Sequence, residues 1–357
     1  MKSSARHWLL AAGLVLTGSP AVAQGVTPGR FEVPGLDWGP SSAWRVKAAQ
    51  IRARRSDLVR SGNLRSLNAN QPFFSSAFRA GGTSAVAVTG NYAVPAVAIA
   101  YSDVAAPFPA ADYQNVLFSP APHPLGRPFS LKTYYEQISG GRITMTGRVF
   151  DVVQVDSSST YYQQNCNGLN LPGRAACPDN GRRFGLMLLA ALDSVSNRPG
   201  SDTVWSQFDN DGADGLPNSG DDDGEVDFVT FLQPTKDGAC GGPGIWAHRW
   251  VMSVWNNGSK YVTKTPRRNS LGQPIPGQFI RVDNYTIQSQ VGGLTACDAP
   301  VPGLGALPSQ IMSIGIVAHE TGHAFGLPDL YDTGTGTEGI GEWGLMGSGG
   351  YTKSSSP

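Results

Sequence analysis

The sequence carries little charge and no excess of either sign. Its 357 residues contain 27 Lys and Arg and 27 Asp and Glu, so that charged residues make up only 15 % of the chain. Bulk binding of nucleic acid needs a strong basic excess, and we therefore expect no nucleic-acid partner. Long apolar runs are also missing, because Gly, Pro and Asn interrupt every apolar stretch after the N-terminal one. We therefore expect no membrane anchor in the mature protein.

The N-terminal apolar run is too short to cross a membrane. Lys2 and Arg6 precede an apolar stretch over Trp8–Leu16, and the small residues that follow end in Ala21–Ala23. A basic start, a short apolar stretch and an A-x-A end are typical of a secretory signal peptide. We therefore expect residues 1–23 to be removed and the mature protein to be secreted, in the extracellular space or the periplasm.

Cysteine is scarce, and no C-x-x-C spacing occurs, which argues against a zinc site built from cysteine. The four cysteines are Cys166, Cys177, Cys240 and Cys297. An even number in an exported chain favours two disulfides, but three pairings are possible and the sequence does not choose between them. The pairing that we expect joins Cys166 to Cys177 across a short polar loop, and Cys240 to Cys297.

Gly and Pro are abundant, with 45 and 26 residues, so a helical bundle or coiled coil is excluded. The patterns between the turns predict strands over Ala96–Tyr101, over Arg142–Val155 (one long strand or a hairpin) and over Val226–Leu232. Phe184–Val195 is apolar nearly all round, which predicts a helix buried against a sheet. Ser309–Phe325 predicts a second helix. We therefore expect a mixed α/β (α+β) fold with a twisted mixed sheet and a buried backing helix.

Residues 24–85 differ in charge from the remainder. They hold nine basic and three acidic residues, whereas the chain after residue 85 holds 16 basic and 24 acidic residues. Ala43–Arg60 lacks Gly and Pro, so we expect a helix with an arginine-rich face there. The opposite charges suggest a pro-segment that lies across the acidic domain until it is removed. A solvated helix or a flexible leader fits the composition equally well.

The most informative segment begins at His319 and reads HETGHAFGLPD. Residues four apart lie on one face of a helix, so His319 and His323 can bind one metal ion. Glu320 can reach a water on that ion without binding the metal, and we expect it to act as general base. Zinc suits this chemistry because it keeps an open fourth position and lowers the pKa of bound water to about 7. A core helix with two hydrogen-bonded histidines is the alternative.

The residues that follow favour the metal site. Gly326 lies three residues after His323, where the helix must stop, and glycine adopts a positive φ without strain. The chain can then double back and present Asp329 as the third zinc ligand. The spacing H-E-x-x-H-x-x-G-x-x-D resembles that of metzincin peptidases, with Asp329 in place of their third histidine. Met346, in EWGLMG, can supply the Met-containing turn that lies beneath the metal in those enzymes.

Other residues are candidates for the same region. Glu342 is an alternative third ligand at the longer spacing of thermolysin-type enzymes, but it lies among glycines rather than on a second helix, and we favour Asp329. Asp332 is expected to support the ligands rather than bind the metal. Tyr351 can approach the oxyanion, although an ordinary surface tyrosine is the simpler interpretation. We expect His248 in the core, beside the helix that carries HETGH.

An acidic segment precedes the strand predicted over Val226–Leu232. It contains seven aspartates from the FDNDG motif through DDDGEVD, which would repel one another without a cation. Calcium takes about 6–8 oxygen ligands, and short loops supply them from Asp and Asn with Gly at the sharp turns. We expect a structural calcium site with the ligands Asp209, Asp211, Asp223 and Asp227. The bidentate Glu of an EF-hand is missing, and a solvated acidic loop is the alternative.

Several motifs together resemble the immune inhibitor A family of secreted bacterial metallopeptidases. They are HETGHAFGLPDLYD, EWGLMGSGGY and three segments over Ser130–Gly147, Phe208–Val229 and Gly244–Trp250. The resemblance spans roughly residues 95 to 351. It implies a zincin- or metzincin-like catalytic domain, which we place over residues 86–357, with an active-site helix and a zymogen form. It also implies the zinc ligands His319, His323 and Asp329 and the catalytic residue Glu320.

We therefore expect a secreted zinc endopeptidase that acts as a monomer on protein or peptide substrates, with catalytic zinc and structural calcium. The alternative from another class is a non-catalytic exported calcium-binding module with a peptidase-like fold. Glu320 argues against this alternative, because a binding module needs no general base beside two metal ligands. A zinc hydrolase of non-peptide amides or esters would use the same chemistry of metal and water, and it stays open.

Overall fold

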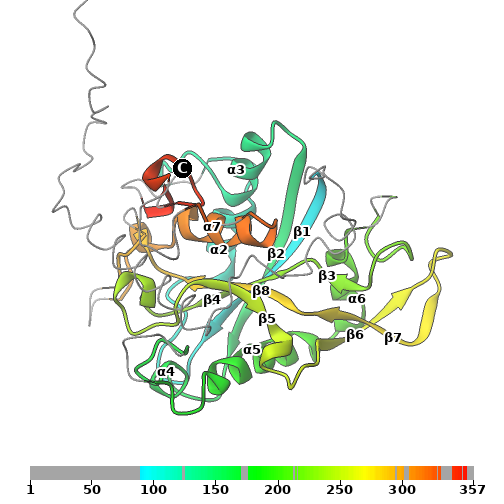
Figure 1. The fold of residues 1–357 in the computed structure, drawn as a ribbon, viewed down its shortest axis with the longest axis horizontal. Helices are drawn as coiled ribbons and strands as arrows, with labels where there is room; N and C mark the ends of the chain where they lie inside the picture. Colours follow the sequence, from blue (N-terminus) through cyan, green and yellow to red (C-terminus); the bar gives the residue numbers. More distant parts are fainter. Residues whose placement is uncertain are drawn as a thin grey trace, which may run out of the picture. The chain divides into compact units, whose positions relative to one another are not determined.

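The computed structural model describes residues 89–351, except 123–124, 170–175, 212–213, 215, 294–295, 301–304, 328, 331–339 and 348. The expected signal peptide and basic leader therefore lie outside the described residues. Within the described part, the chain forms a five-stranded sheet, a three-stranded sheet and helices on both faces of the larger sheet (Figure 1). The predicted mixed α/β class is confirmed.

The larger sheet is mixed, with the strand order β2-β1-β4-β8-β5. Neighbouring strands are parallel except for the edge strand β5, which is antiparallel to β8. The long strand expected over Arg142–Val155 is confirmed as a single strand rather than a hairpin. The strands are β1 (Gly90–Ala100), β2 (Ile143–Gln154), β4 (Val229–Gln233), β5 (His248–Val251) and β8 (Asn284–Ser289).

Side chains alternate along the strands of this sheet and divide the core into two layers. On β1, Val97 and Ile99 belong to the layer that packs against α5, whereas Ala96 and Ala98 belong to the layer on the opposite face. Figure 1 shows α5 on one side of the sheet and α2, α3 and α7 on the other. These helices span α2 (Ala110–Phe118), α3 (Leu131–Ile138), α5 (Arg182–Ser196) and α7 (Ile314–Ala324).

The predicted backing helix is confirmed as α5, although it is not buried all round. Phe184 and Leu188 are fully buried, whereas Leu186 is 45 % exposed. The chain also forms short helices α4 (Ser159–Gln163) and α6 (Ser201–Val204). The 3-10 turns span Trp205–Phe208, Gly238–Cys240, Met252–Val254, Pro308–Gln310, Gly341–Trp343 and Gly349–Tyr351. None of the described helices combines the length and hydropathy needed to span a bilayer.

The single strand expected over Val226–Leu232 is two strands in different sheets. Val226 ends β3 in the smaller sheet, and Val229 begins β4 in the larger one. The expectation fails because the chain crosses between the sheets at Asp227 and Phe228. In the smaller sheet β3 (Glu225–Val226) is parallel to β7 (Pro274–Val282), which pairs in antiparallel fashion with β6 (Tyr261–Arg268).

Two disulfides join the cysteines in the expected pairing. Cys166 is bonded to Cys177 and Cys240 to Cys297, with Cα–Cα distances of 5.5 and 5.2 Å. The second disulfide ties the chain after β4 to the chain between β8 and α7. The two cysteines are 57 positions apart, so the bond removes much of the freedom of the unfolded chain. It also fixes the chain segment that leads into α7.

Helix α7 begins later than the sequence predicts. The helix was expected from Ser309, but Pro308–Gln310 forms a separate 3-10 turn and α7 starts at Ile314. The residues between are extended, and Ile311 pairs in antiparallel fashion with Val291. Backbone groups of Gln310, Ile311 and Met312 form hydrogen bonds with the chain that continues β8. These groups are therefore not available for the hydrogen bonds of a helix.

The guanidinium of Arg127 also holds this extended segment. Arg127 is only 4 % exposed. Its Nη2 atom donates to the carbonyl oxygens of Ile311 at 2.8 Å and Ser309 at 3.3 Å, and its Nη1 atom donates to that of Met312. Burial lowers the pKa of the Arg127 guanidinium. A buried cation that bonds to three backbone carbonyls therefore fixes the position at which α7 starts.

Candidate metal centre

Helix α7 ends in a left-handed glycine, and the predicted positive φ is confirmed. Gly326 has a φ of 80°. The N–H of Leu327 donates to the carbonyl of Gly322, and the N–H of Gly326 donates to that of His323, both at 2.9 Å. This pair of bonds is the Schellman motif, in which a side chain with a Cβ would be strained. The turn reverses the chain so that Asp329 meets the helix that it has just left.

Hydrogen bonds to the backbone orient both histidines of α7. The Nδ1 atom of His319 lies 2.8 Å from the carbonyl oxygen of Leu345, and that of His323 lies 2.8 Å from the carbonyl oxygen of Leu327. A carbonyl oxygen only accepts, so each Nδ1 atom must carry the proton. Each Nε2 atom therefore presents its lone pair, which is the tautomer that metal-binding histidines adopt.

The two lone pairs face one carboxylate oxygen. The Oδ1 atom of Asp329 lies 3.1 Å from the Nε2 atom of His319 and 3.2 Å from that of His323. One potential ligand atom from each of the three side chains lies within 4.8 Å of those of the other two. Both histidines are buried. Nitrogen lone pairs and a carboxylate oxygen repel one another unless a cation lies between them. Two imidazoles and one carboxylate fit the ligand preference of zinc.

Glu320 is fully buried and lies on α7 next to the first histidine. Tyr135 of α3 is its neighbour, and the hydroxyl of Tyr135 donates to the carbonyl oxygen of Ala318 at 2.5 Å. The pKa of Tyr135 is raised well above its ordinary value, first by burial and then by Tyr134 and the charge of Glu320. The contact between α3 and α7 did not emerge from the sequence, because Tyr135 and Ala318 are 183 positions apart.

Met346 packs against the middle of α7. Its Sδ atom lies 2.5 Å from the place that a Cβ at Gly322 would occupy, and the Tyr135 hydroxyl lies 3.4 Å from it. Met346 is 4 % exposed. Glycine inside a helix is unfavourable, and an isolated one signals close approach by another part of the chain. Gly322, which lies between the two histidines in the sequence, therefore leaves space for the side chain of Met346.

The alternative ligand Glu342 does not join the histidine pair. Among the described residues, the acid that groups with both histidines is Asp329, whereas Glu342 lies in the 3-10 turn Gly341–Trp343. Asp332 and the side chain of Tyr351 lie outside the described residues.

His248 is a core histidine, as expected, but its ring faces α5 rather than α7. It is 2 % exposed, and its Nε2 atom lies 2.9 Å from the hydroxyl of Tyr285. The ring packs edge to face on Phe184 of α5, with 5.5 Å between ring centroids. His248 is therefore structural, and the expected position beside α7 is wrong because β5 turns this side chain to the other face of the sheet.

Comparison with known proteins identifies the family of this chain. A family model for the immune inhibitor A peptidase M6 catalytic domain matches residues 98–299 and 306–356. The chain belongs to this family. The matched ranges contain the HETGH helix, the turn with Met346 and the acidic segment.

Two relatives of this M6 chain carry peptidase or inhibitor names. The chain is 29 % identical over 251 residues to the pre-pro-metalloprotease PrtV of Vibrio cholerae serotype O1, a match that covers 67 % of this chain and 23 % of PrtV. It is 28 % identical over 249 residues to immune inhibitor A of Bacillus thuringiensis subsp. alesti, which covers 66 % of this chain and 31 % of that protein. The chain therefore spans less than a third of the length of these relatives.

The acidic segment of the M6 chain forms a second group of ligand atoms. Carboxylate oxygens of Asp209, Asp211 and Asp223 lie within 4.8 Å of one another. Asp209 is fully buried, and neither of its carboxylate oxygens has a hydrogen-bond partner among the described residues. Asp227, the fourth expected ligand, is not part of this close group. It accepts a hydrogen bond from Asn210 at 3.0 Å.

Burial and mutual repulsion change the ionisation of these carboxyls. Burial raises the pKa of Asp209 from 3.8 to about 8, and the charges of Asp222, Asp223, Asp211 and Asp227 contribute further. The pKa of Asp227 also rises to about 8, again mainly because of burial. Without a cation the acidic segment therefore holds protons at neutral pH, and these protons must leave before the carboxylates can bind a metal.

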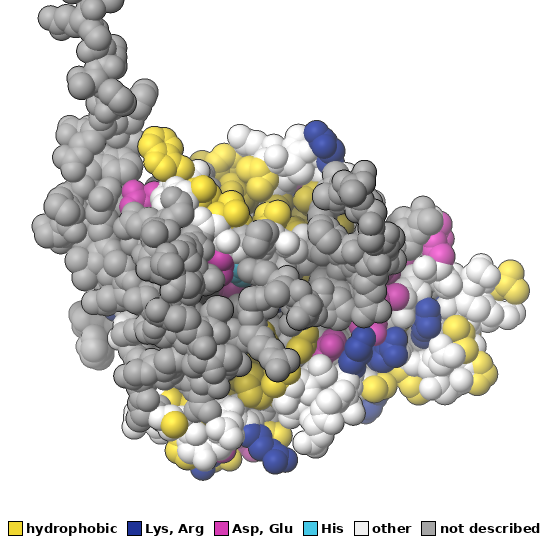
Figure 2. Space-filling view, in the orientation of Figure 1, with side chains coloured by type: hydrophobic (Ala, Val, Ile, Leu, Met, Phe, Trp, Pro, Cys, Tyr) yellow, Lys and Arg dark blue, Asp and Glu magenta, His cyan; other side chains and the backbone are white. Residues whose placement is uncertain are grey.

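Basic residues in and beside the smaller sheet hold the acidic segment in place. Arg281 of β7 pairs with Glu225 at 3.0 Å, and Lys260 pairs with the same carboxylate. Arg267 of β6 donates to the carbonyl oxygen of Asp222 at 2.6 Å. Figure 2 shows Lys and Arg side chains beside Asp and Glu side chains over this region. The smaller sheet therefore supports the segment that presents Asp209 and Asp223.

The contact between Gly322 and Met346 generates a prediction. Ala is a better helix former than Gly by about 1 kcal/mol, but in the wild-type background the new Cβ collides with the Met346 sulfur. Gly322→Ala should therefore bring no stability there and should weaken metal binding. In a Met346→Ala background the collision is gone, and Gly322→Ala should raise the free energy of unfolding by about 0.5–1 kcal/mol. Urea unfolding of the four chains measures this; equal effects in both backgrounds would contradict the contact.

Proposed function

We propose that this chain is a secreted zinc-dependent endopeptidase. Membership in the M6 family supports a metallopeptidase. The observation that carries the proposal is the orientation of the two histidines, whose Nε2 lone pairs face one oxygen of Asp329 at 3.1 and 3.2 Å. Two imidazole nitrogens and one carboxylate match the three protein ligands of catalytic zinc sites, which keep a fourth position for water or substrate.

Glu320 is the group that would move the proton in peptide hydrolysis. Zinc held by His319, His323 and Asp329 would polarise the substrate carbonyl and lower the pKa of water at the open position. The carboxylate of Glu320 would accept a proton from the attacking water and then pass it to the nitrogen of the leaving amine. The histidine Nδ1 protons are held by backbone carbonyls, so the imidazoles do not take part in this transfer.

A non-catalytic calcium-binding module stays the alternative from another class. Such a module would keep the acidic segment but would not need Glu320 beside two ligands. Retention of Glu320 therefore supports the enzyme.

Residues 1–23 are proposed as a signal peptide and residues 24–85 as a removable pro-segment ahead of the catalytic domain over residues 86–357. The Vibrio cholerae relative is named a pre-pro-metalloprotease, and a pro-segment of this chain would correspond to the second part of that name. The leader is basic and the remainder is acidic, so the two attract. Exposed ion pairs contribute little individually and weaken with salt.

The acidic segment is proposed as a structural calcium site. The support is the close group of Asp209, Asp211 and Asp223, together with a buried Asp209 carboxylate that has no hydrogen-bond partner among the described residues. Asp227 would complete the set after a small movement of its side chain. Calcium would neutralise the repulsion and fix the chain where it enters β4.

The zinc proposal predicts different losses for different substitutions. Glu320→Gln keeps the side-chain volume and both imidazoles, so zinc content should stay near one per chain while proteolysis falls by about 10²–10⁴-fold. His319→Ala should lose zinc and activity together, because two ligands do not hold the ion. Digestion of a denatured protein, with and without a zinc chelator, and zinc analysis of each purified chain measure these outcomes.

Glu342→Gln is the matched control for these substitutions. It makes the same chemical change at the alternative ligand, and we expect normal zinc content and normal proteolysis. Loss of zinc in this variant would replace Asp329 by Glu342 in the ligand set. Full proteolysis in Glu320→Gln would remove Glu320 as the base.

The calcium proposal predicts a pH dependence. The pKa of Asp209 is raised to about 8 in the folded metal-free protein. The folded protein therefore binds more protons than the unfolded protein between about pH 4 and pH 8. Its free energy of unfolding falls as pH rises through that range. Calcium binds the ionised carboxylates and so offsets this loss of unfolding free energy. The rise in Tm on adding calcium should therefore be larger at pH 8 than at pH 5.

Free calcium at about 100 times Kd should raise the free energy of unfolding by about 2.7 kcal/mol. Calorimetry with zinc kept bound measures both effects.

Two substitutions separate this site from a general effect of salt. Asp209→Asn should abolish the calcium response and make the metal-free protein more stable at pH 8, because it removes the buried charge. Asp214→Asn, at an exposed position of the same segment, should keep the response. An unchanged Tm over a wide range of calcium concentrations in the wild-type chain would refute the site.

The pro-segment proposal predicts latency that depends on the leader. A chain that begins at Gln24 should cleave an unstructured substrate more slowly than one that begins near Thr83, because the leader covers the acidic domain. Cleavage between Arg52 and Ser76 should release the activity. Specific activities of both refolded chains, at low and high salt, test this. Equal activities would leave the leader as a folding aid or a tether.

A further inference from the structure

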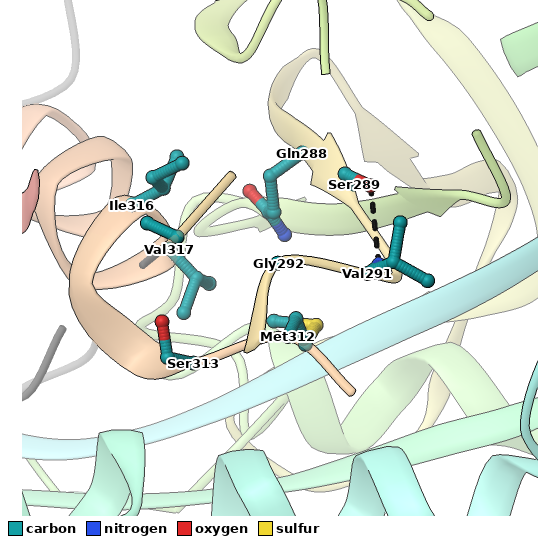
Figure 3. Close-up of a pocket in the computed structure, with 9 residues that line it drawn as sticks. Gln288, Ser289, Val291, Gly292, Met312, Ser313, Ile316 and Val317 are labelled. Atoms are coloured by element: carbon teal, nitrogen blue, oxygen red, sulfur yellow. Dashed lines mark hydrogen bonds between the residues drawn. The ribbon is translucent and has the colours of Figure 1, made fainter. Parts of the chain in front are cut away.

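A small cavity lies between the end of β8 and the start of α7. Its volume is about 10 Å³. Gln288 of β8 and Gly292 form one side, and Ser313, Ile316 and Val317 form the other (Figure 3). None of these residues belongs to the candidate metal centre, although Val317 lies one helical turn before Glu320.

Two side chains on the wall have polar atoms without partners. Gln288 is 2 % exposed, and neither its Oε1 nor its Nε2 atom has a hydrogen-bond partner among the described residues. The same holds for the hydroxyl of Ser313, which is 6 % exposed. The hydroxyl of Ser289, also on the wall, instead donates to Thr235 and accepts from the N–H of Val291. An orphaned polar group of this kind costs about 1–3 kcal/mol, so the cavity must satisfy Gln288 and Ser313 in some other way.

Figure 3 shows where these groups point. The Gln288 amide extends from β8 toward Gly292 and Val317, and the Ser313 hydroxyl points toward Val317 from the start of the helix. Ser313 occupies the N-cap position of α7, yet its side chain makes no capping hydrogen bond. The first N–H groups of a helix have no partner within it and carry a partial positive charge. The cavity therefore offers a donor and an acceptor from Gln288 and a hydroxyl, close to the positive end of α7.

We propose that this cavity binds one water molecule, which joins Gln288 of β8 to Ser313 at the start of α7. A buried water needs about 10–15 Å³ and two to four polar partners, and both conditions are met. Water both donates and accepts, so it matches an amide and a hydroxyl. A cation would leave the amide N–H groups unsatisfied, and an anion would leave the amide oxygen unsatisfied. The proposal does not depend on the peptidase activity.

The water would connect the sheet to the helix directly after the segment that Arg127 holds. Arg127 holds the carbonyls of Ile311 and Met312, which precede the N-cap. The water would hold the N-cap residue itself through its side chain. Together they would fix both the position and the direction of the first turn of α7.

The direct test is a crystal structure of the mature chain at a resolution that defines ordered waters. We expect one density peak within hydrogen-bond distance of the Gln288 amide and the Ser313 hydroxyl. An ion in that place, an empty cavity, or a Gln288 amide bonded directly to protein would overturn the proposal.

Substitutions provide an independent test in solution. Gln288→Met and Ser313→Ala each remove one partner of the water, and each should raise the ratio of unfolded to folded protein about tenfold. The double variant should also raise it only about tenfold rather than about a hundredfold, because the first substitution already removes the bridge. Ser309→Ala, at an exposed position nearby, is the control and should change nothing. Additive effects of Gln288→Met and Ser313→Ala would refute a shared water.

Discussion

Two hydrogen bonds between imidazoles and the backbone govern the chemistry available to this molecule. The Nδ1 protons of His319 and His323 are held by the carbonyl oxygens of Leu345 and Leu327, so both lone pairs face Asp329. Each of these two carbonyls belongs to a turn that also has a structural role. Leu327 follows the left-handed Gly326, and Leu345 precedes the methionine that fills the gap at Gly322. The turns that end and support α7 therefore also select the tautomers of its histidines.

Local spacing predicted the parts of this centre that depend on neighbouring residues. The i and i+4 histidines, the glycine stop at Gly326 and the return of the chain to Asp329 all follow from a few consecutive positions. The start of α7 could not be predicted in this way. The carbonyls of Ile311 and Met312 are bonded to Arg127, which lies 184 and 185 positions earlier. The helix signal in the sequence was genuine, but a distant guanidinium competed for its first residues.

The acidic segment also shows what the sequence alone does not predict. Its composition indicated a cation site, but composition does not distinguish a buried carboxylate from a solvated one. The fold makes that separation, since Asp209 is fully enclosed whereas Asp211 and Asp223 are exposed. The division between β3 and β4 has the same origin. The pattern over Val226–Leu232 is mostly apolar, and only the pairing of β3 with β7 reveals that its first residues belong to another sheet.

The long separation between Arg127 and its acceptors has a consequence for the order of synthesis. A ribosome makes the chain from its N-terminus, so Arg127 and Tyr135 emerge long before the helix that they hold. Contacts at such separations form late, because the loop between them must close first. The candidate ligands follow both residues in the chain and come together only when almost the whole domain has been made. An unfinished chain therefore lacks the contacts that hold the helix with the candidate ligands in place.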